Sequence, residues 1–247
     1  MVSTSPDYAR RIRVLIQDAI ATGRPYDAVH IEHFRGAVAA DLFQPLDARV
    51  VYDAVDCLAA LAEQAQKHGP RRAVRLVAAA ERWRTRRAED QLLDYADTVS
   101  VVAERDWAAM IRDRRIANVV VVPNGVERSP LGPGRLPDRP RAVFTGKLSY
   151  HANQAAAQWL LEEIWPLVRR EMPAAELTIA GADPPAWLRE TASRQGAKLI
   201  ANPPDMDDVI RAARVAVAPI VYSVGIQNKV LEAMAAGRPV VTTTSAV

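Results

Sequence analysis

The sequence feature that most constrains the fold is a regular alternation of short runs rich in β-branched residues with longer helical stretches. The short runs lie at residues 28–32, 50–53, 99–102, 119–122, 142–145, 176–180, 198–201, 215–219 and 240–243. Helical stretches separate them, and the longest, at residues 71–95, is rich in Ala, Leu, Glu and Arg. This alternation predicts an α/β fold with parallel sheets covered by helices.

Prolines and glycines interrupt the alternation at residues 123–140, and a segment of this kind suits neither a helix nor a central strand. We therefore predict two Rossmann-like domains at residues 1–123 and 141–247, joined by a linker at 124–140. The carboxyl ends of their strands are expected to face a shared cleft.

Both domains are expected to be truncated. The first opens with a predicted helix at residues 8–20 instead of a strand and a glycine loop, and no helix follows the last predicted strand. Incomplete sheets expose strand edges, so we expect a homo-oligomer or a complementing chain.

Composition limits where the chain can work. Cys57 is the single cysteine, so no disulfide can form within the chain, and the first residues are too polar for a secretory signal. No apolar run approaches the roughly 20 residues that cross a bilayer. These features predict a cytoplasmic protein, at most peripheral to the inner face of the membrane.

The charge of the chain, +3 overall, is concentrated in one predicted helix between Arg71 and Arg87, which also carries Trp83. Such a patch can contact anionic lipid headgroups or polyphosphate. Alternatively, it is a solvated face that nearby acidic residues partly neutralise. Nucleic acid is not expected as a partner, because no aromatic platform or known binding motif accompanies the charge.

The last part of the chain carries the clearest candidate site. Gly225 precedes a predicted helix that bears Lys229 and Glu232, and a Gly-Arg-Pro stop and a valine-rich strand follow. A helix N-terminus attracts a diphosphate, and a carboxylate one turn further on can accept bonds from two vicinal hydroxyls. This pattern suits a sugar nucleotide, although a Lys and Glu pair three positions apart also occurs on ordinary exposed helices.

Several motifs in sequence order make the prediction more specific. They are VPNGV at residues 122–126, FTGK at 144–147 followed by Asn153, IWP at 164–166, LTIAG at 177–181, and the block at 225–241. This set resembles family 4 retaining glycosyltransferases of the GT-B fold. The sequence from Gly225 to Ala235, with residues 26–33, is similar to sugar transferases associated with bacterial exopolysaccharide clusters.

The resemblance implies roles for residues at both ends of the second domain. Glu232 would hold the ribose hydroxyls, and Lys229 would supply positive charge. The backbone near the diphosphate would come from Gly225, Ile226, Gln227 and Asn228. A second phosphate clamp would involve Gly146, Lys147 and Asn153.

The chain departs from the family pattern at three of these positions. Lys147 and Asn153 stand where the family usually has Arg and Lys, and Val224 stands where a first glutamate is usual. Lys147 keeps the charge without the planar fork of arginine, and Asn153 donates hydrogen bonds without charge.

Metal binding is not expected. His30 and His33 lie three positions apart near a strand end, so their side chains diverge. The resemblance implies a histidine near the donor sugar in this loop, and His33 is our candidate, with Glu32 as the alternative. Asp205 and Asp207 match a metal-binding Asp-x-Asp pattern, but their place at the start of a helix favours capping.

Two further groups are given mainly structural interpretations. Asp53 and Asp56 follow a strand, where turn formation competes with a role on the acceptor side. The apolar residues of the predicted helix at 153–171 are interpreted as one core-facing stripe, formed by Trp159, Leu160, Ile164, Trp165 and Leu167.

The resemblance implies that the chain is a hexosyltransferase-like enzyme. It would transfer a sugar from a nucleotide-diphosphate donor to a carbohydrate or lipid-linked acceptor, with retention and without a metal or other cofactor, and the first domain would bind the acceptor. Two alternatives remain: a non-catalytic nucleotide-binding remnant or piece of a split enzyme, and a sugar-nucleotide epimerase.

Overall fold

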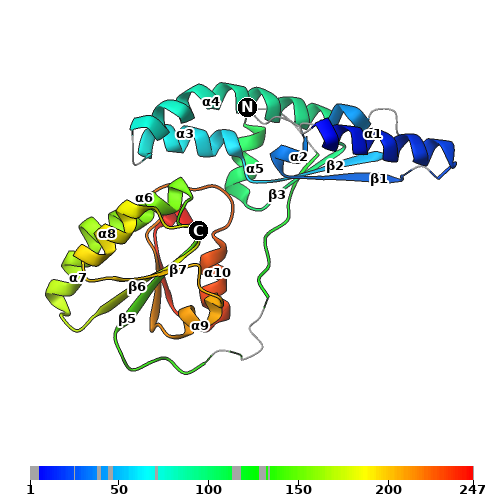
Figure 1. Cartoon of the computed structure of the whole chain (residues 1–247). Helices are drawn as coiled ribbons and strands as arrows, with labels where there is room; N and C mark the ends of the chain where they lie inside the picture. The colour runs from blue at the N-terminus through cyan, green and yellow to red at the C-terminus, as the bar shows by residue number, and fades with distance from the viewer. Residues whose placement is uncertain are drawn as a thin grey trace. The chain divides into compact units, whose positions relative to one another are not determined.

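The computed structural model describes residues 6–24, 26–37, 40–43, 47–69, 72–112, 118–127, 132 and 134–246. The chain forms two compact units. The first unit contains Met1–Ala62 and Ala80–Pro123, and the second contains Glu63–Ala79 and Asn124–Val247. Figure 1 shows the course of the chain through both.

The first unit is built on a four-stranded parallel sheet in the order β1-β2-β3-β4. Its strands are β1 (Ala28–Glu32), β2 (Arg49–Val55), β3 (Thr98–Val101) and β4 (Val119–Val121). The accompanying helices are α1 (Pro6–Ala21), α2 (His33–Ala37), η1 (Ala40–Phe43), α3 (Leu58–His68), α4 (Arg72–Tyr95) and α5 (Glu104–Ile111), and α3 and α4 continue into the second unit.

Alternation along β2 shows how this sheet forms its core. Val50, Tyr52 and Ala54 are buried, and the residues between them are partly exposed. Val99 and Val101 of β3 join the same apolar cluster, into which Leu92 and Leu93 of α4 also pack. The period of two along β2 therefore distinguishes a face that packs against the core from a face that is partly open to solvent.

The second unit contains a five-stranded parallel sheet in the order β7-β6-β5-β8-β9. Its strands are β5 (Arg141–Thr145), β6 (Glu176–Gly181), β7 (Lys198–Ala201), β8 (Val215–Ala218) and β9 (Val240–Thr242). The helical segments are α6 (His151–Trp159), η2 (Leu160–Ile164), α7 (Trp165–Glu171), α8 (Ala186–Arg194), α9 (Met206–Arg211), α10 (Asn228–Ala235) and η3 (Thr244–Ala246).

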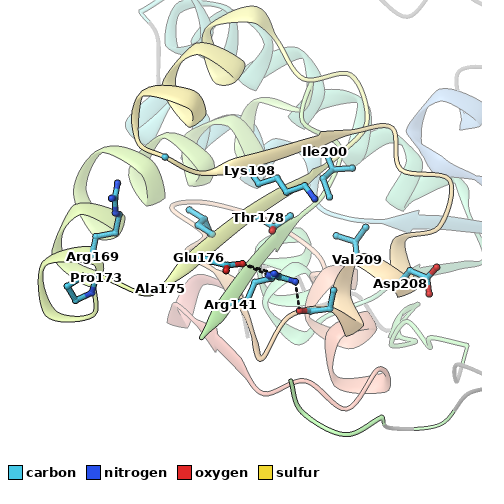
Figure 2. A pocket seen from close by; sticks show the side chains of 13 residues that line it. Arg141, Arg169, Pro173, Ala175, Glu176, Thr178, Lys198, Ile200, Asp208 and Val209 are labelled. Carbon is cyan, nitrogen blue, oxygen red and sulfur yellow. Dashed lines mark hydrogen bonds and ion pairs between the residues drawn. The ribbon is translucent and has the colours of Figure 1, made fainter. Parts of the chain in front are cut away.

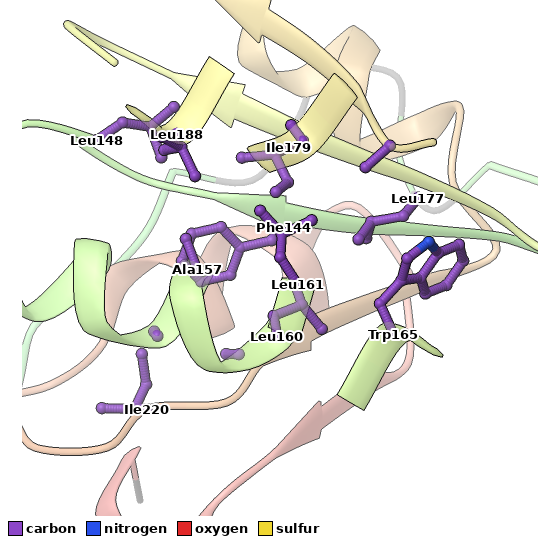
Figure 3. Packing of buried hydrophobic residues seen from close by; sticks show 14 of the residues in the cluster. Phe144, Leu148, Ala157, Leu160, Leu161, Trp165, Leu177, Ile179, Leu188 and Ile220 are labelled. Carbon is purple, nitrogen blue, oxygen red and sulfur yellow. The ribbon is translucent and has the colours of Figure 1, made fainter. Parts of the chain in front are cut away.

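Successive side chains of β5 pack on opposite faces of this sheet. Phe144 belongs to the cluster that contains Leu160, Leu161 and Trp165 from the α6–α7 region (Figure 3). Val143 belongs to a second cluster, to which α9 and α10 contribute. Because β5 is covered on both faces, it reads in the sequence as a short continuous apolar run.

The predicted helix at 153–171 is interrupted by a π-helical turn at Leu160–Ile164. Pro166 follows this turn, and because proline lacks a backbone N–H and clashes with the preceding turn, the regular hydrogen-bond ladder cannot continue through it. The extra residue in the turn rotates the helix face. Trp159 and Leu167 are consequently 39% and 54% exposed, so the prediction of one core-facing stripe is wrong for these two residues.

Three arginines of the second unit hold the described part of the linker. Arg211 donates to the Gly132 carbonyl at 2.6 Å, Arg214 to the Pro137 carbonyl at 2.9 Å, and Arg238 to the Arg135 carbonyl at 3.2 Å. The linker residues 128–131 and 133 lie outside the described residues. The described linker backbone thus has specific partners despite its lack of regular structure.

Each of the nine predicted strands is present within two residues of its predicted bounds. The strands pair in parallel throughout both sheets, as the alternation predicts. Within the ranges that the structure describes, no helix is both long enough and apolar enough to span a membrane.

Candidate functional site

The second sheet reverses its strand order between β5 and β8. From β5 the chain proceeds outward to β6 and β7, and then returns to the other side of β5 with β8 and β9. In open parallel sheets, ligands bind outside the carboxyl ends of the strands at such a point. The loop after β5 and the segment before α10 both begin there.

Two glycines allow the loop after β5 to lie close to its neighbours. At Gly181, whose φ is 158°, an added Cβ would lie 1.7 Å from the carbonyl oxygen of Gly146. At Gly146, whose φ is 150°, an added Cβ would lie 2.9 Å from Asn153 Nδ2 and 3.1 Å from Lys229 Nζ. A side chain at either position would therefore force this loop or its polar neighbours to move.

Asn153 links the loop after β5 to α10. It is buried in the first turn of α6, and its Nδ2 donates to the Lys147 carbonyl at 2.9 Å. Its Oδ1 accepts a hydrogen bond from Lys229 Nζ. The structure therefore brings together Gly146, Lys147, Asn153 and Lys229, four of the residues predicted from the sequence.

Lys229 is a largely buried cation. Its Nζ lies 4.8 Å from the centre of the Phe144 ring, which allows a cation–π interaction. Burial lowers the pKa of Lys229 to about 8, although Glu232 on the same helix acts in the opposite direction. The ammonium therefore lies in an environment where an added negative charge has a large effect.

The start of α10 presents backbone groups at the same end of the sheet. Gly225 is buried and adopts a left-handed conformation with φ of 65°. Ile226 and Gln227 lead into the helix, where the N-cap residue Gln227 makes no side-chain capping bond. The Asn228 carboxamide instead accepts a bond of 3.1 Å from Asn124, in the motif at 122–126. The positive end of the α10 dipole thus lies at this end of the sheet, where it favours a bound anion.

Glu232 lies one turn further along α10 and is exposed. Its spacing from Lys229 places both residues on one side of the helix. A carboxylate at this distance from the helix start is suited to accept bonds from hydroxyl groups of a ligand whose phosphates lie at the N-terminus. This role is a prediction from the sequence and the resemblance.

The structure adds two features that the sequence patterns did not single out. Phe144 supplies the ring beside Lys229, although in the sequence it reads only as a core residue of a strand. His151 Nδ1 lies 2.7 Å from Tyr222 Oη, and the two rings stack with centroids 5.7 Å apart. No local pattern could reveal that pair, because 71 residues separate its members.

His33 belongs to the first unit, where it opens α2 directly after β1. It has a left-handed backbone with φ of 60°, and its Nε2 lies 3.7 Å from Glu32 Oε1. Non-glycine residues rarely adopt this conformation, and such strain is often found at functional sites. The role of His33 near a donor sugar stays a prediction.

Two aspartates at the end of β2 have different surroundings. Asp53 accepts bonds from the Val55 amide at 3.2 Å and from Ser100 Oγ at 3.0 Å, which confirms its role in turn formation. The pKa of Asp56 is raised to about 6, mainly by burial and also by Asp106, although His33 and Arg105 act to lower it. Asp56 is thus a carboxyl group whose charge changes near neutral pH.

Two buried carboxylates of the first unit anchor the start of α3. Asp106 accepts from the Cys57 amide at 2.9 Å, and Glu89 accepts from the Ala59 amide at 3.2 Å. Burial raises the pKa of Glu89 to about 7, and the hydrogen bonds from the backbone act against that shift. These carboxylates accept from amides at the start of α3, where backbone N–H groups have no partner within the helix.

The Asp-x-Asp pattern is a helix cap. Asp205 accepts a bond of 2.8 Å from the Asp207 amide, and Asp207 pairs with Arg211 at 2.6 Å. Among the residues that the structure describes, no three His, Cys, Asp or Glu side chains are grouped closely enough to hold a metal ion.

A cavity of about 470 Å³ lies at the opposite end of the second sheet. Arg141, Glu176 and Lys198, the first residues of three neighbouring strands, contribute to its lining (Figure 2). Arg141 donates to Glu176 at 2.8 and 2.6 Å, and these bonds lower the pKa of the Glu176 carboxyl. None of the predicted site residues lines this cavity.

The second unit also matches a known family. Residues 139–247 match the sequence model described as Glycosyl transferases group 1. No curated protein matched the sequence.

Solved structures resemble the chain over nearly its whole length. The OtsA apo structure has a TM-score of 0.65 and 15% identity, and the alignment covers 97% of this chain and 63% of OtsA. An alpha,alpha-trehalose-phosphate synthase (UDP-forming) from Burkholderia xenovorans, in complex with glucose-6-phosphate, has a TM-score of 0.66 and 13% identity. The alignment covers 99% of this chain and 66% of the synthase. A mutant of S. aureus TarM, in complex with Fondaparinux, alpha-GlcNAc-glycerol and UDP, has a TM-score of 0.66 and 12% identity. The alignment covers 95% of this chain and 43% of TarM.

These likenesses establish the fold class. The chain has the two parallel-sheet α/β domains of the GT-B fold. It spans between 43% and 66% of the length of the three proteins compared above.

Proposed function

We propose that this chain carries the nucleotide-sugar site of a glycosyltransferase. The enzyme would move a hexose from a nucleotide-diphosphate donor to a carbohydrate or lipid-linked acceptor, with retention of the anomeric configuration. The observation that carries the proposal is the grouping of Gly146, Lys147, Asn153 and Lys229 beside the start of α10. The match of residues 139–247 to Glycosyl transferases group 1 supports it.

The arrangement suits a leaving diphosphate better than a neutral ligand. Lys229 is a desolvated cation, and the first turn of α10 adds backbone dipoles at the same edge of the sheet. Lys147 has an exposed side chain on the loop that Asn153 holds. Charge that develops on the diphosphate as the sugar leaves would therefore meet positive groups already in place.

The proposed transfer needs no protein nucleophile and no metal or other cofactor. The bond from the anomeric carbon to the diphosphate oxygen breaks, and the acceptor hydroxyl oxygen bonds to that carbon on the same face. The hydroxyl proton passes to the departing diphosphate. Lys147, Lys229 and the backbone of Gly225, Ile226, Gln227 and Asn228 would hold the leaving group, while Glu232 would hold the ribose.

Binding and turnover can be measured separately. Calorimetry with UDP, GDP and ADP tests the nucleotide site and identifies the base. Glu232→Ala should lower affinity about tenfold or more, because bonds from two hydroxyls to a charged acceptor are lost. Adenosine, guanosine and uridine without phosphate should bind far more weakly. Unchanged nucleotide affinity in Glu232→Ala would show that the ribose lies elsewhere.

Radiolabelled donor sugars distinguish the proposed reaction from its alternatives. Transfer of label to a carbohydrate or lipid-linked acceptor supports the glycosyltransferase. Nucleotide binding without turnover supports a non-catalytic module or one piece of a split enzyme, and conversion of the free sugar nucleotide supports an epimerase. The narrower proposal, a family 4 enzyme of an exopolysaccharide cluster, predicts transfer to a lipid-linked or oligosaccharide acceptor.

We also propose peripheral membrane contact through the arginine-rich helix, at the cytoplasmic face. The described part of α4 exposes Leu76 and Trp83 among arginines, and Arg71 lies outside the described residues. Exposed apolar side chains flanked by basic ones favour anionic headgroups. Sedimentation with phosphatidylglycerol vesicles should show binding that Trp83→Ala weakens, whereas vesicles of phosphatidylcholine should bind little. Equal binding to both would contradict the proposal.

A further inference from the structure

The partner that fixes Lys229 is a neutral carboxamide. Asn153 is 8% exposed, and its two polar atoms point to different elements. Nδ2 donates to the Lys147 carbonyl at 2.9 Å, and Oδ1 accepts from Lys229 Nζ. Asn153 therefore joins the loop after β5 to α10 through the ammonium group.

A neutral partner has a different effect from an acidic one. A carboxylate at position 153 would neutralise Lys229 and would repel an incoming phosphate. The carboxamide orients the ammonium by one hydrogen bond and adds no negative charge of its own. The small Gly146 beside both groups leaves space, because any Cβ there would come within 3.1 Å of Lys229 Nζ.

We propose that Asn153 is a positioning residue whose neutral carboxamide holds Lys229 in place without neutralising its charge. A diphosphate binds beside Lys229, and Lys229 takes up a proton from solvent as the diphosphate binds. This inference rests on the proposed function, since it concerns the same nucleotide site. It assigns a role to Asn153, and it states that nucleotide binding is coupled to the uptake of a proton.

The groups that face Lys229 determine the direction of the proton transfer. Glu232 on α10 favours the charged form of Lys229. The contacts from β5 and α6 are neutral, namely the Phe144 ring and the Asn153 carboxamide. The side chain of Lys147, on the loop after β5, is exposed. Burial outweighs Glu232 and lowers the pKa of Lys229 to about 8. A diphosphate brought next to this ammonium raises the pKa again, so the site takes a proton from solvent as it fills.

Calorimetry of the full chain at pH 8.5, in two buffers of different ionisation enthalpy, measures this uptake directly. UDP, GDP and ADP are used as probes, and their phosphates are already ionised at this pH because phosphate groups lose their second proton near pH 6. We expect uptake of about 0.8 proton per nucleotide, the fraction of Lys229 that is neutral at pH 8.5 if its pKa is about 8. Affinity should fall about tenfold between pH 7.5 and pH 9.

Substitutions separate positioning from packing. Asn153→Asp should lower affinity about tenfold or more and reduce proton uptake to near zero, because Lys229 stays charged in both states. Asn153→Ala should lower affinity and retain the uptake. Lys229→Met should lower affinity and abolish the uptake.

Gln154→Glu is the matched control. It makes the same amide-to-acid change one position along α6, where the Gln154 side chain bonds to the Ser149 carbonyl at 3.0 Å. We expect wild-type proton uptake and affinity within about twofold of wild type. Thermal unfolding of each variant verifies that it is folded.

The outcomes distinguish this inference from the proposed function. If none of the three nucleotides binds the wild-type chain, the proposed function fails and the inference fails with it. If a nucleotide binds without proton uptake, or if Asn153→Asp keeps both uptake and affinity, the inference alone is overturned. A purely structural role for Asn153 predicts equal loss of affinity in the Ala and Asp variants, with uptake retained in both.

Discussion

The two units bury ionisable groups in opposite ways. In the first unit, Glu89 and Asp106 are buried carboxylates whose hydrogen bonds go to backbone amides at the start of α3. In the second unit, Lys229 is a partly buried cation that donates a hydrogen bond to a neutral side chain. The carboxylates accept hydrogen bonds from amides that open α3, whereas Lys229 forms no ion pair with a carboxylate in the described part of the chain.

This difference indicates which buried charges serve the fold and which serve a ligand. Hydrogen bonds from backbone amides offset part of the desolvation of a buried carboxylate and also satisfy the amides. A desolvated ammonium whose described contacts are a carboxamide and a ring keeps part of its desolvation cost, which a diphosphate can relieve. Four predictions test this distinction, from the largest expected effect to the smallest.

Glu89→Ala should have the largest effect. Removing the carboxylate leaves the Ala59 amide and its neighbourhood without a buried acceptor, so we expect the first unit to lose about 3 kcal/mol of unfolding free energy. Hydrogen exchange followed by mass spectrometry localises the loss. Glu81→Ala is the control, since Glu81 lies on the same helix in a more exposed pair with Arg84 at 3.9 Å. Equal destabilisation by both variants would contradict the capping role of Glu89.

Lys229→Met should separate binding from stability. The variant loses a charged hydrogen-bond donor to the diphosphate, so UDP affinity should fall about 10- to 100-fold. The second unit should become no less stable at pH 7, because a desolvated charge has been replaced by an apolar chain of similar length. Calorimetry and thermal unfolding measure the two effects. A strongly destabilised second unit would indicate that Lys229 serves the fold, as Glu89 does.

The stabilities of the two units should change with pH in opposite directions. The pKa of Glu89 is raised from 4.5 to about 7 in the folded state, so its contribution is present below pH 4.5 and is lost as pH rises through 7. The pKa of Lys229 is lowered from 10.5 to about 8, so the second unit gains stability as pH rises from 8 to 10.5.

Hydrogen exchange across this pH range, corrected for intrinsic exchange rates, reports on each unit. Glu89→Gln should reduce the pH dependence of the first unit, with Asp56 supplying the remainder, and Lys229→Met should flatten the pH dependence of the second unit between pH 8 and 10.5. Parallel pH dependence of the two units would show that other groups dominate.

Asp205→Ala should have the smallest effect. Asp205 caps α9 by accepting from the Asp207 amide at 2.8 Å, as Asp106 and Glu89 do for α3, but it is exposed. Water can replace it, so we expect a loss of about 1 kcal/mol in the second unit. Asp205→Asn should restore most of the stability. If Asp205→Ala lost as much stability as Glu89→Ala, burial would not explain why the two capping carboxylates are expected to differ.

Local sequence patterns were sufficient for much of the fold. The runs at 28–32 and 198–201 coincide with β1 and β7. Both are outer strands whose residues are mostly exposed or partly buried, so strand-forming residue types identified them and continuous burial did not. The helix at 153–171 was predicted as continuous, and the π turn before Pro166 was missed. Its cause was visible as a proline in the sequence, but the resulting change of helix face depends on how the turn repacks.

The candidate site was predictable only in part. Gly146, Lys147, Asn153 and Lys229 were identified from motifs, yet the bond that joins Asn153 to Lys229 spans 76 positions. Phe144, Tyr222 and Glu89 carry no local signal of their roles, because their partners come from distant segments. The roles of His33 and Glu232 stay predictions.

By itself, the sequence determined the alternation of strands and helices, the parallel sheets, and the residue types present at the end of β5 and the start of α10. These properties follow from hydrophobic period, turn chemistry and helix signals, which act over a few neighbouring residues. Only the tertiary structure decided that a buried carboxamide, and not a charged side chain, contacts Lys229. The order of strands brings those groups together, and burial then sets the strength of their interactions.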